Sequence, residues 1–120
     1  MPVIPAFMLK KLYVQGSLAN TPDGFSLALK NTLAQGTIVG MRPLVVDGRE
    51  YPPDSITVTI AGLSVSAAKV GKQTPHAFPI GVTATLQVQA EPLVHGEHSL
   101  AITVETREVG ELNIEVTDRL

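Results

Sequence analysis

The chain has 120 residues, of which 44% belong to apolar types and 17% are charged. This length supports one domain with a hydrophobic core and is too short for two. Nine basic and 11 acidic residues leave a formal net charge of −2, which provides no basic surface for nucleic acid or an anionic membrane. The absence of cysteine excludes disulfides, thiolate metal sites and a cysteine nucleophile, and it fits a reducing compartment.

The first residues are apolar but lack the features of a signal peptide. Residues 1–8 contain two prolines, and Lys10 and Lys11 follow the apolar stretch instead of preceding it. No uninterrupted apolar run approaches the roughly 18 residues that a membrane-spanning helix needs. We therefore expect a single domain over residues 1–120, with residues 1–8 as an apolar N-terminal arm, in a cytoplasmic protein that binds no membrane.

Apolar and polar residues alternate with a period of two through most of the chain, in the segments 25–30, 56–60, 82–88, 99–106 and 112–117. Such alternation is typical of antiparallel strands with one buried face. The best helical candidate is about one turn at 66–70. The predicted core consists of the inward-facing residues Phe25, Leu27, Leu29, Ile56, Val58, Ile60, Leu86, Val88, Leu100, Ile102, Val104, Leu112 and Ile114.

Turn-forming residues separate these segments. Asp47–Gly48, Ala61–Gly62 and Val109–Gly110 each lie between two predicted strands, Pro22–Gly24 is a turn that opens the strand at Phe25, and 71–81 is the longest predicted loop. An Asp-Gly pair favours a type I′ hairpin turn because both residues tolerate a positive φ. Seven to eight short strands, spaced about 10 to 15 residues apart, predict an all-β fold. We expect a two-sheet antiparallel β-sandwich, immunoglobulin-like or jelly-roll-like.

One group of residues has a spacing that resembles metal ligands: His95, Glu97 and His98. A glycine lies inside the group and a strand follows directly, which favours a turn and then an inward-facing His98. The imidazole would hydrogen-bond to the loop backbone, as a corner tyrosine does in many sandwiches. We therefore assign no metal ligand and no cofactor. The alternative is a small stand-alone sandwich enzyme, or a metal- or ligand-binding module, that uses this cluster and the 71–81 loop.

Other catalytic patterns are missing from the sequence. Glu105 and Glu115 lie on outward faces of predicted strands, and His76 has no obvious acidic or hydroxyl partner in its loop. There is no GxSxG, no Walker-type loop and no GxGxxG. We assign no catalytic residue and expect that the chain by itself is not an enzyme.

Five segments of the chain form one ordered set of short motifs: Ser17–Asn20, Gly24–Leu27, Leu44–Thr59, Phe78–Gly81 and Leu93–His98. In this order they resemble the small β subunit of bacterial C-glycoside deglycosidases. The resemblance implies a β-sandwich subunit bound to a larger sugar-isomerase-type barrel, which holds the divalent metal and the catalytic residues. This chain would then be a non-catalytic structural or partner subunit in C-glycoside deglycosidation, or a stand-alone relative.

The opening Ile4–Val14 is also similar to that of short chains bearing the name hydroxymethylglutaryl-CoA reductase. With 120 residues and no nucleotide-binding signature, we do not expect that activity from this chain alone.

The outward-facing positions of several predicted strands are polar but almost uncharged. Interface cores are depleted in charged residues, whereas a freely solvated sheet usually carries more lysine and glutamate. We therefore expect assembly, as a homo-oligomer and/or with a larger barrel-type catalytic subunit. The alternative is that threonine simply favours strands. The residues concerned are Thr57, Thr59, Thr83, Thr85, Gln87, Gln89, Ala101 and Thr103.

Overall fold

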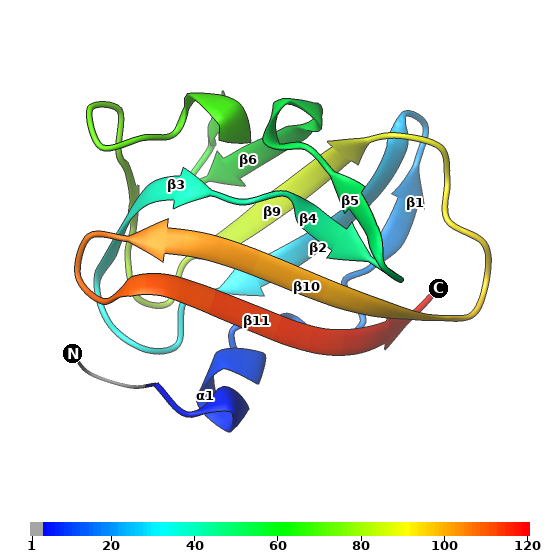
Figure 1. The fold of residues 1–120 in the computed structure, drawn as a ribbon, viewed down its shortest axis with the longest axis horizontal. Coiled ribbons are helices and arrows are strands. Elements are labelled where there is room, and N and C mark those ends of the chain that lie inside the picture. The colour runs from blue at the N-terminus through cyan, green and yellow to red at the C-terminus, as the bar shows by residue number, and fades with distance from the viewer. Residues whose placement is uncertain (1–3) are drawn as a thin grey trace.

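The computed structural model describes residues 4–120, which form two antiparallel β-sheets packed face to face (Figure 1). Sheet A contains, in spatial order, β1 (Ala19–Thr21), β2 (Gly24–Lys30), β9 (Thr83–Gln89), β6 (Ile56–Ile60) and β7 (Leu63–Ser66). Sheet B contains β5 (Arg49–Tyr51), β4 (Leu44–Val46), β10 (Glu97–Thr106), β3 (Gly36–Met41) and β8 (His76–Phe78), and β11 (Gly110–Arg119) pairs with β10. The predicted all-β sandwich is confirmed, with eleven strands over the described residues instead of seven to eight.

Strand β10 organises sheet B. It pairs with β11 along its whole length, while β4 and β3 share its other side at opposite ends. The chain passes from one sheet to the other after β2, β5, β7, β8 and β9. These crossings bring the turn between β4 and β5 beside the beginning of β10, far apart in sequence.

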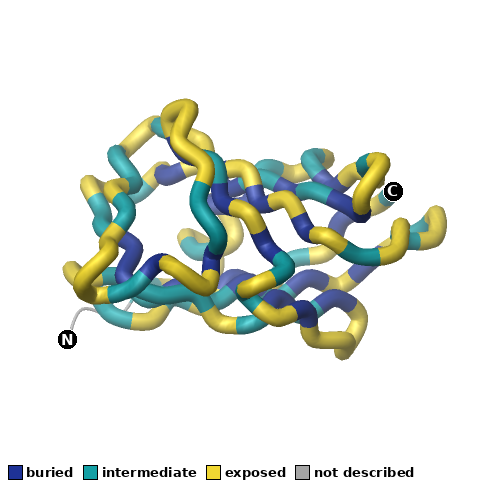
Figure 2. The backbone as a smooth tube through the Cα atoms, turned by 90° about the horizontal axis from the view of Figure 1, so that it is seen from above, coloured by how far each residue is buried: buried dark blue, intermediate teal, exposed yellow. Residues whose placement is uncertain are grey.

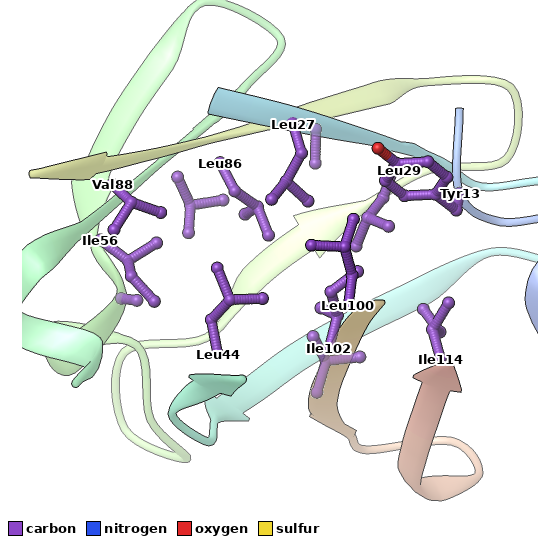
Figure 3. Close-up of a cluster of buried hydrophobic side chains, with 14 of the residues drawn as sticks. Tyr13, Leu27, Leu29, Leu44, Ile56, Leu86, Val88, Leu100, Ile102 and Ile114 are labelled. Carbon is purple, nitrogen blue, oxygen red and sulfur yellow. The ribbon is translucent and has the colours of Figure 1, made fainter. Parts of the chain in front are cut away.

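The predicted alternation produces the core between the sheets. Buried and exposed positions alternate along the strands in Figure 2, and Figure 3 shows side chains from both sheets meeting in the middle. Of the thirteen predicted core residues, twelve are buried, and Leu112 is partly buried against the same cluster. Further buried residues complete the core: Leu12, Tyr13, Leu18, Ile38, Leu44, Val46, Tyr51, Ala67, Val70 and Ala84.

Two hairpin turns have the type I′ geometry that was predicted for Asp47–Gly48, whereas Ala61–Gly62 was predicted only as a tight connection. Asp47 and Gly48 adopt φ values of 52° and 85° between β4 and β5, and Ala61 and Gly62 adopt 53° and 81° between β6 and β7. Two successive positive φ angles match the type I′ turn, whose twist suits the flanking strands. The helical candidate at 66–70 is the single 3₁₀ turn η2 (Ala67–Lys69).

Three short elements were not predicted. Helix α1 (Ala6–Lys10) begins within the predicted apolar arm at 1–8 and packs against β11; residues 1–3 lie outside the described residues. The 3₁₀ turn η1 (Pro53–Ser55) follows β5, and β8 lies inside the predicted 71–81 loop, where it pairs with β3. These elements are too short to repeat a helical or strand period. No helix within residues 4–120 is long and apolar enough to cross a membrane.

Candidate functional site

His98 joins three segments at the beginning of β10. Its side chain is buried, its Nδ1 lies 2.6 Å from Oδ2 of Asp47, and its Nε2 lies 2.7 Å from the carbonyl oxygen of Val94. Asp47 also accepts a 2.8 Å hydrogen bond from the amide of Ser99. The predicted inward orientation of His98 and its bond to the loop backbone are confirmed. The role of Asp47 was missed, because its position in the sequence indicated only a turn.

Both ring nitrogens of His98 face acceptors, so the protonated imidazolium can donate from both. The carbonyl of Val94, and then the carboxylate of Asp47, raise the pKa of His98 above its ordinary value. The amide of Ser99, and then His98, hold the pKa of the Asp47 carboxyl below its ordinary value. The arrangement is a charged clamp between the β4–β5 turn and the segment that leads into β10.

This clamp predicts how stability depends on pH. Because folding raises the pKa of His98, its contribution is complete below the unfolded value of 6.5 and is lost as the pH rises through the folded pKa. Because folding lowers the pKa of Asp47, its contribution is present above the unfolded value of 3.8 and is lost as the pH falls through the folded pKa. We expect the melting temperature to fall as the pH rises above about 6.5. In Asp47→Asn, which retains a favourable turn pair, this fall should be smaller; equal falls would contradict the clamp.

The structure does not bring the proposed ligand cluster together as a metal site. His95 and Glu97 are exposed, whereas His98 points inward to its two acceptors. Among residues 4–120 there is no group of three or more His, Cys, Asp or Glu side chains placed to hold a metal ion. In the 71–81 region, the Nδ1 of His76 lies 3.0 Å from the carbonyl oxygen of its neighbour Ala77.

A second buried ionisable group, Asp118, anchors the segment that precedes β1. It accepts hydrogen bonds from the hydroxyl of Tyr13 at 2.5 Å, from the amide of Gly16 at 3.0 Å and from the amide of Leu18 at 3.2 Å. Burial acts to raise the pKa of Asp118, but the donors that surround the carboxylate outweigh it and hold the pKa below its ordinary value. Burial and the neighbouring carboxylate raise the pKa of Tyr13. Sequence reasoning missed this site, because its partners are a hundred residues apart.

A cavity of about 140 Å³ lies between the sheets. The residues that line it include Leu29 and Leu86 from sheet A and Ile114 from sheet B. Figure 3 shows the two leucines on one sheet and Ile114 on the sheet opposite. Two connections reach the cavity: residues 31–35, which follow β2, and residues 108–109 of the β10–β11 turn. Its lining is almost entirely apolar. No sequence pattern indicated this cavity, because its apolar lining residues also fit ordinary core positions and its polar ones, such as Gln35 and Glu108, fit ordinary loop and turn positions.

Hydrogen bonds tie each of the two connections to a neighbouring strand beside the cavity. Glu108 accepts two 2.8 Å hydrogen bonds from Thr37, one from the amide and one from the hydroxyl. The hydroxyl and then the amide lower the pKa of Glu108, so the carboxylate is favoured. The Nδ2 of buried Asn31 donates to the carbonyls of Ala34 and Phe78, both at 2.7 Å. The wall of the cavity is therefore braced by polar groups that are already paired.

The outer surface of sheet A is wide and almost uncharged. Cross-strand pairing places the outward side chains in rows across β2, β9, β6 and β7, one of which runs Ala28–Thr85–Thr59–Ser64. Lys30, at the end of β2, is the only charged residue among these outward positions. We call this surface the neutral face; it consists of Ser26, Ala28, Lys30, Thr57, Thr59, Ser64, Ser66, Thr83, Thr85, Gln87 and Gln89. The predicted Ala101 and Thr103 lie on sheet B, apart from it.

Fold and sites together define a small β-sandwich domain in which the buried His98 and Asp118 are both held by structural hydrogen bonds. The family model of the hydroxymethylglutaryl-CoA reductase, N-terminal domain, matches residues 8–120. The chain belongs to this family. A search of curated protein sequences finds no match to the chain.

This membership corrects the resemblance to the small β subunit of C-glycoside deglycosidases, which is wrong. The segments that suggested it are short, and several are turn and strand signals that any β-sandwich needs. The pair Asp47–Gly48 supplies the two positive φ angles of a tight hairpin, and Pro52 and Pro53 end the strand that follows it. Such features reflect the needs of local backbone geometry and do not identify a protein family.

Proposed function

We propose that the chain is a non-catalytic accessory domain that assembles with a second copy of itself through the neutral face. The observation that carries the proposal is the continuity of this face across four neighbouring strands, with Lys30 alone charged and at one end. Burying a charge without a partner is costly, whereas hydroxyl and amide groups can exchange hydrogen bonds across an interface.

A second copy is the partner that suits this surface. A two-fold interface sets the same patch of both copies against each other. A face with one sign of charge would repel its copy, but this face has almost no charge to repel. Sheet B offers a poorer surface, because Glu105, Glu111 and Glu115 accompany Arg42 and Arg119 along its exposed strands and connections.

The buried ionisable groups support a non-catalytic role. The nitrogens of His98 are both paired, and the carboxylate of Asp118 accepts hydrogen bonds from the chain itself. A general base or a nucleophile needs a side chain that can reach a substrate. The family description, an N-terminal domain of hydroxymethylglutaryl-CoA reductase, is compatible with an accessory role beside the part that performs the reaction. We also propose that the chain works in the cytoplasm, which fractionation of its native cells would test.

Charge placed on the neutral face tests the proposal. Thr85 and Gln87 are both exposed and lie on β9, near the middle of this face. The wild-type chain should have the mass of a dimer by light scattering at tens of micromolar. Because two copies would set four lysines against one another, the double variant Thr85→Lys/Gln87→Lys should be a monomer with an unchanged circular dichroism spectrum.

A matched control places the same charge on sheet B. Ser99 and Thr117 are exposed and face each other on β10 and β11. The double variant Ser99→Lys/Thr117→Lys should remain a dimer. A monomeric wild-type chain would contradict the proposal, and so would a dimer that only the control variant disrupts.

A further inference from the structure

We infer that the cavity between the sheets is a binding site for a small uncharged apolar ligand, such as a single aromatic ring or a short hydrocarbon group. This site is distinct from the neutral face: it lies between the inner faces of the two sheets. The inference therefore stands whether or not the chain forms a dimer.

The size of the cavity indicates the size of the ligand. Protein interiors are close-packed and hold few voids larger than a water molecule, so a pocket of about 140 Å³ that reaches between the two sheets leaves room for a small molecule. An engineered cavity of about 150 Å³, lined by leucine, isoleucine and phenylalanine, stays dry and binds benzene or xenon. The present cavity has a similar volume, and its walls are mostly apolar, although polar residues such as Asn31 and Thr106 also line it. A ligand that fills it would restore dispersion contacts that the lining side chains now lack.

The cavity can be reached from the end of the sandwich. Leu33 and Val109 are only partly buried, Gln35 is exposed, and all three contribute to the lining. Leu33 and Gln35 belong to the connection after β2, and Val109 belongs to the β10–β11 turn, which the bonds between Glu108 and Thr37 tie to β3. Because these three residues also reach the surface, the lining is accessible from this end of the sandwich.

The polar groups of the lining select against an anionic ligand. Asn31 is already bonded to Ala34 and Phe78, and the hydroxyl of Thr106 donates to the carbonyl of Gly110. Among the residues that the structure describes, Glu108 is the only ionisable one in the lining. The described lining contains no lysine or arginine that could pair with an anionic ligand. The carboxylate of Glu108 would repel such a ligand. An uncharged apolar molecule meets neither obstacle.

Methyl NMR with benzene as the probe tests the site directly. Benzene should give saturable shifts of the methyl groups of Leu29, Leu86 and Ile114, which line the cavity, and leave those of Leu44 and Ile56 unchanged. Benzoate, which has the same ring and a negative charge, should give no saturable shift. Shifts spread over all methyl groups, or none at all, would overturn the inference, and equal binding of benzoate would overturn its selectivity.

Filling the cavity provides the matched variant. Ala84 is buried and lines the cavity, so Ala84→Leu should abolish the benzene-dependent shifts. The same substitution on the outer surface of sheet B, Ala101→Leu, should leave them intact. If Ala84→Leu does not fold, the smaller Ala84→Val should weaken benzene binding severalfold. Unchanged binding in a folded Ala84 variant would show that benzene occupies another place.

Discussion

Replacing Gly24 with alanine is expected to disrupt the pairing of β2 with β9. A Cβ atom at this position would overlap the carbonyl oxygen of Val88 and would lie 2.7 Å from the amide nitrogen of Ala90. Both atoms belong to the backbone of β9 and its continuation, which cannot move aside as a flexible side chain could. Overpacking a well-packed site usually costs about 1–3 kcal/mol and occasionally more. We expect a loss at or above the upper end of this range.

Urea unfolding of Gly24→Ala measures this loss, and Gly36→Ala serves as its control. Gly36 also begins a strand, but the nearest atom to an added Cβ there is 3.7 Å away, which is an ordinary contact. The control should therefore unfold close to the wild-type midpoint. If Gly24→Ala unfolded at that midpoint too, the close approach of β2 to β9 would be wrong.

Ile102→Ala is expected to lower the free energy of unfolding by a similar amount, because it leaves the core underpacked instead of overpacked. Ile102 is 1% exposed in the middle of β10, opposite Ile114 on β11, and its side chain points into the core (Figure 3). Shortening a buried isoleucine loses transfer free energy and leaves a cavity, which together cost about 2–5 kcal/mol.

The exposed neighbour Ser99 on the same strand provides the comparison for Ile102. Ser99→Ala should change the free energy of unfolding by less than about 0.5 kcal/mol, because surface substitutions away from special features usually have small effects. Differential scanning calorimetry of the two variants measures both changes. An Ile102→Ala variant that melts like the wild type would mean that the assignment of this strand and its buried face is wrong.

The fold could be predicted from the sequence where the pattern is long. Segments such as 99–106 repeat the two-residue period several times, so the buried face of β10 follows from local sequence. α1 and β8 have five and three residues, which are too few to repeat any period. These elements are fixed by their neighbours, β11 and β3, which local sequence does not reveal.

The sites were harder to predict because their partners are far apart in sequence. His98 lies 51 residues from Asp47, and Tyr13 lies 105 residues from Asp118. The alternation of inward and outward residues along the strand predicted that His98 faces the inside of the sandwich. The residues near His98 in sequence did not indicate that Asp47 is its acidic partner. The neutral face was only partly predictable for the same reason. The sequence of each strand alone predicts that the outward residues of β6 and β9 are uncharged, but their position beside β2 depends on the order of the strands in the sheet.

The most direct test of the account is the distance between two copies of the chain across the neutral face. The chain contains no cysteine, so one introduced cysteine carries a single spin label. Gln89 lies at the end of β9 on the neutral face, and Thr117 lies on exposed β11 of sheet B. Assembly through the neutral face predicts a shorter distance between the two labels of a dimer for Gln89→Cys than for Thr117→Cys. Absence of any dipolar coupling in both variants, or a shorter distance for Thr117→Cys, would contradict the account.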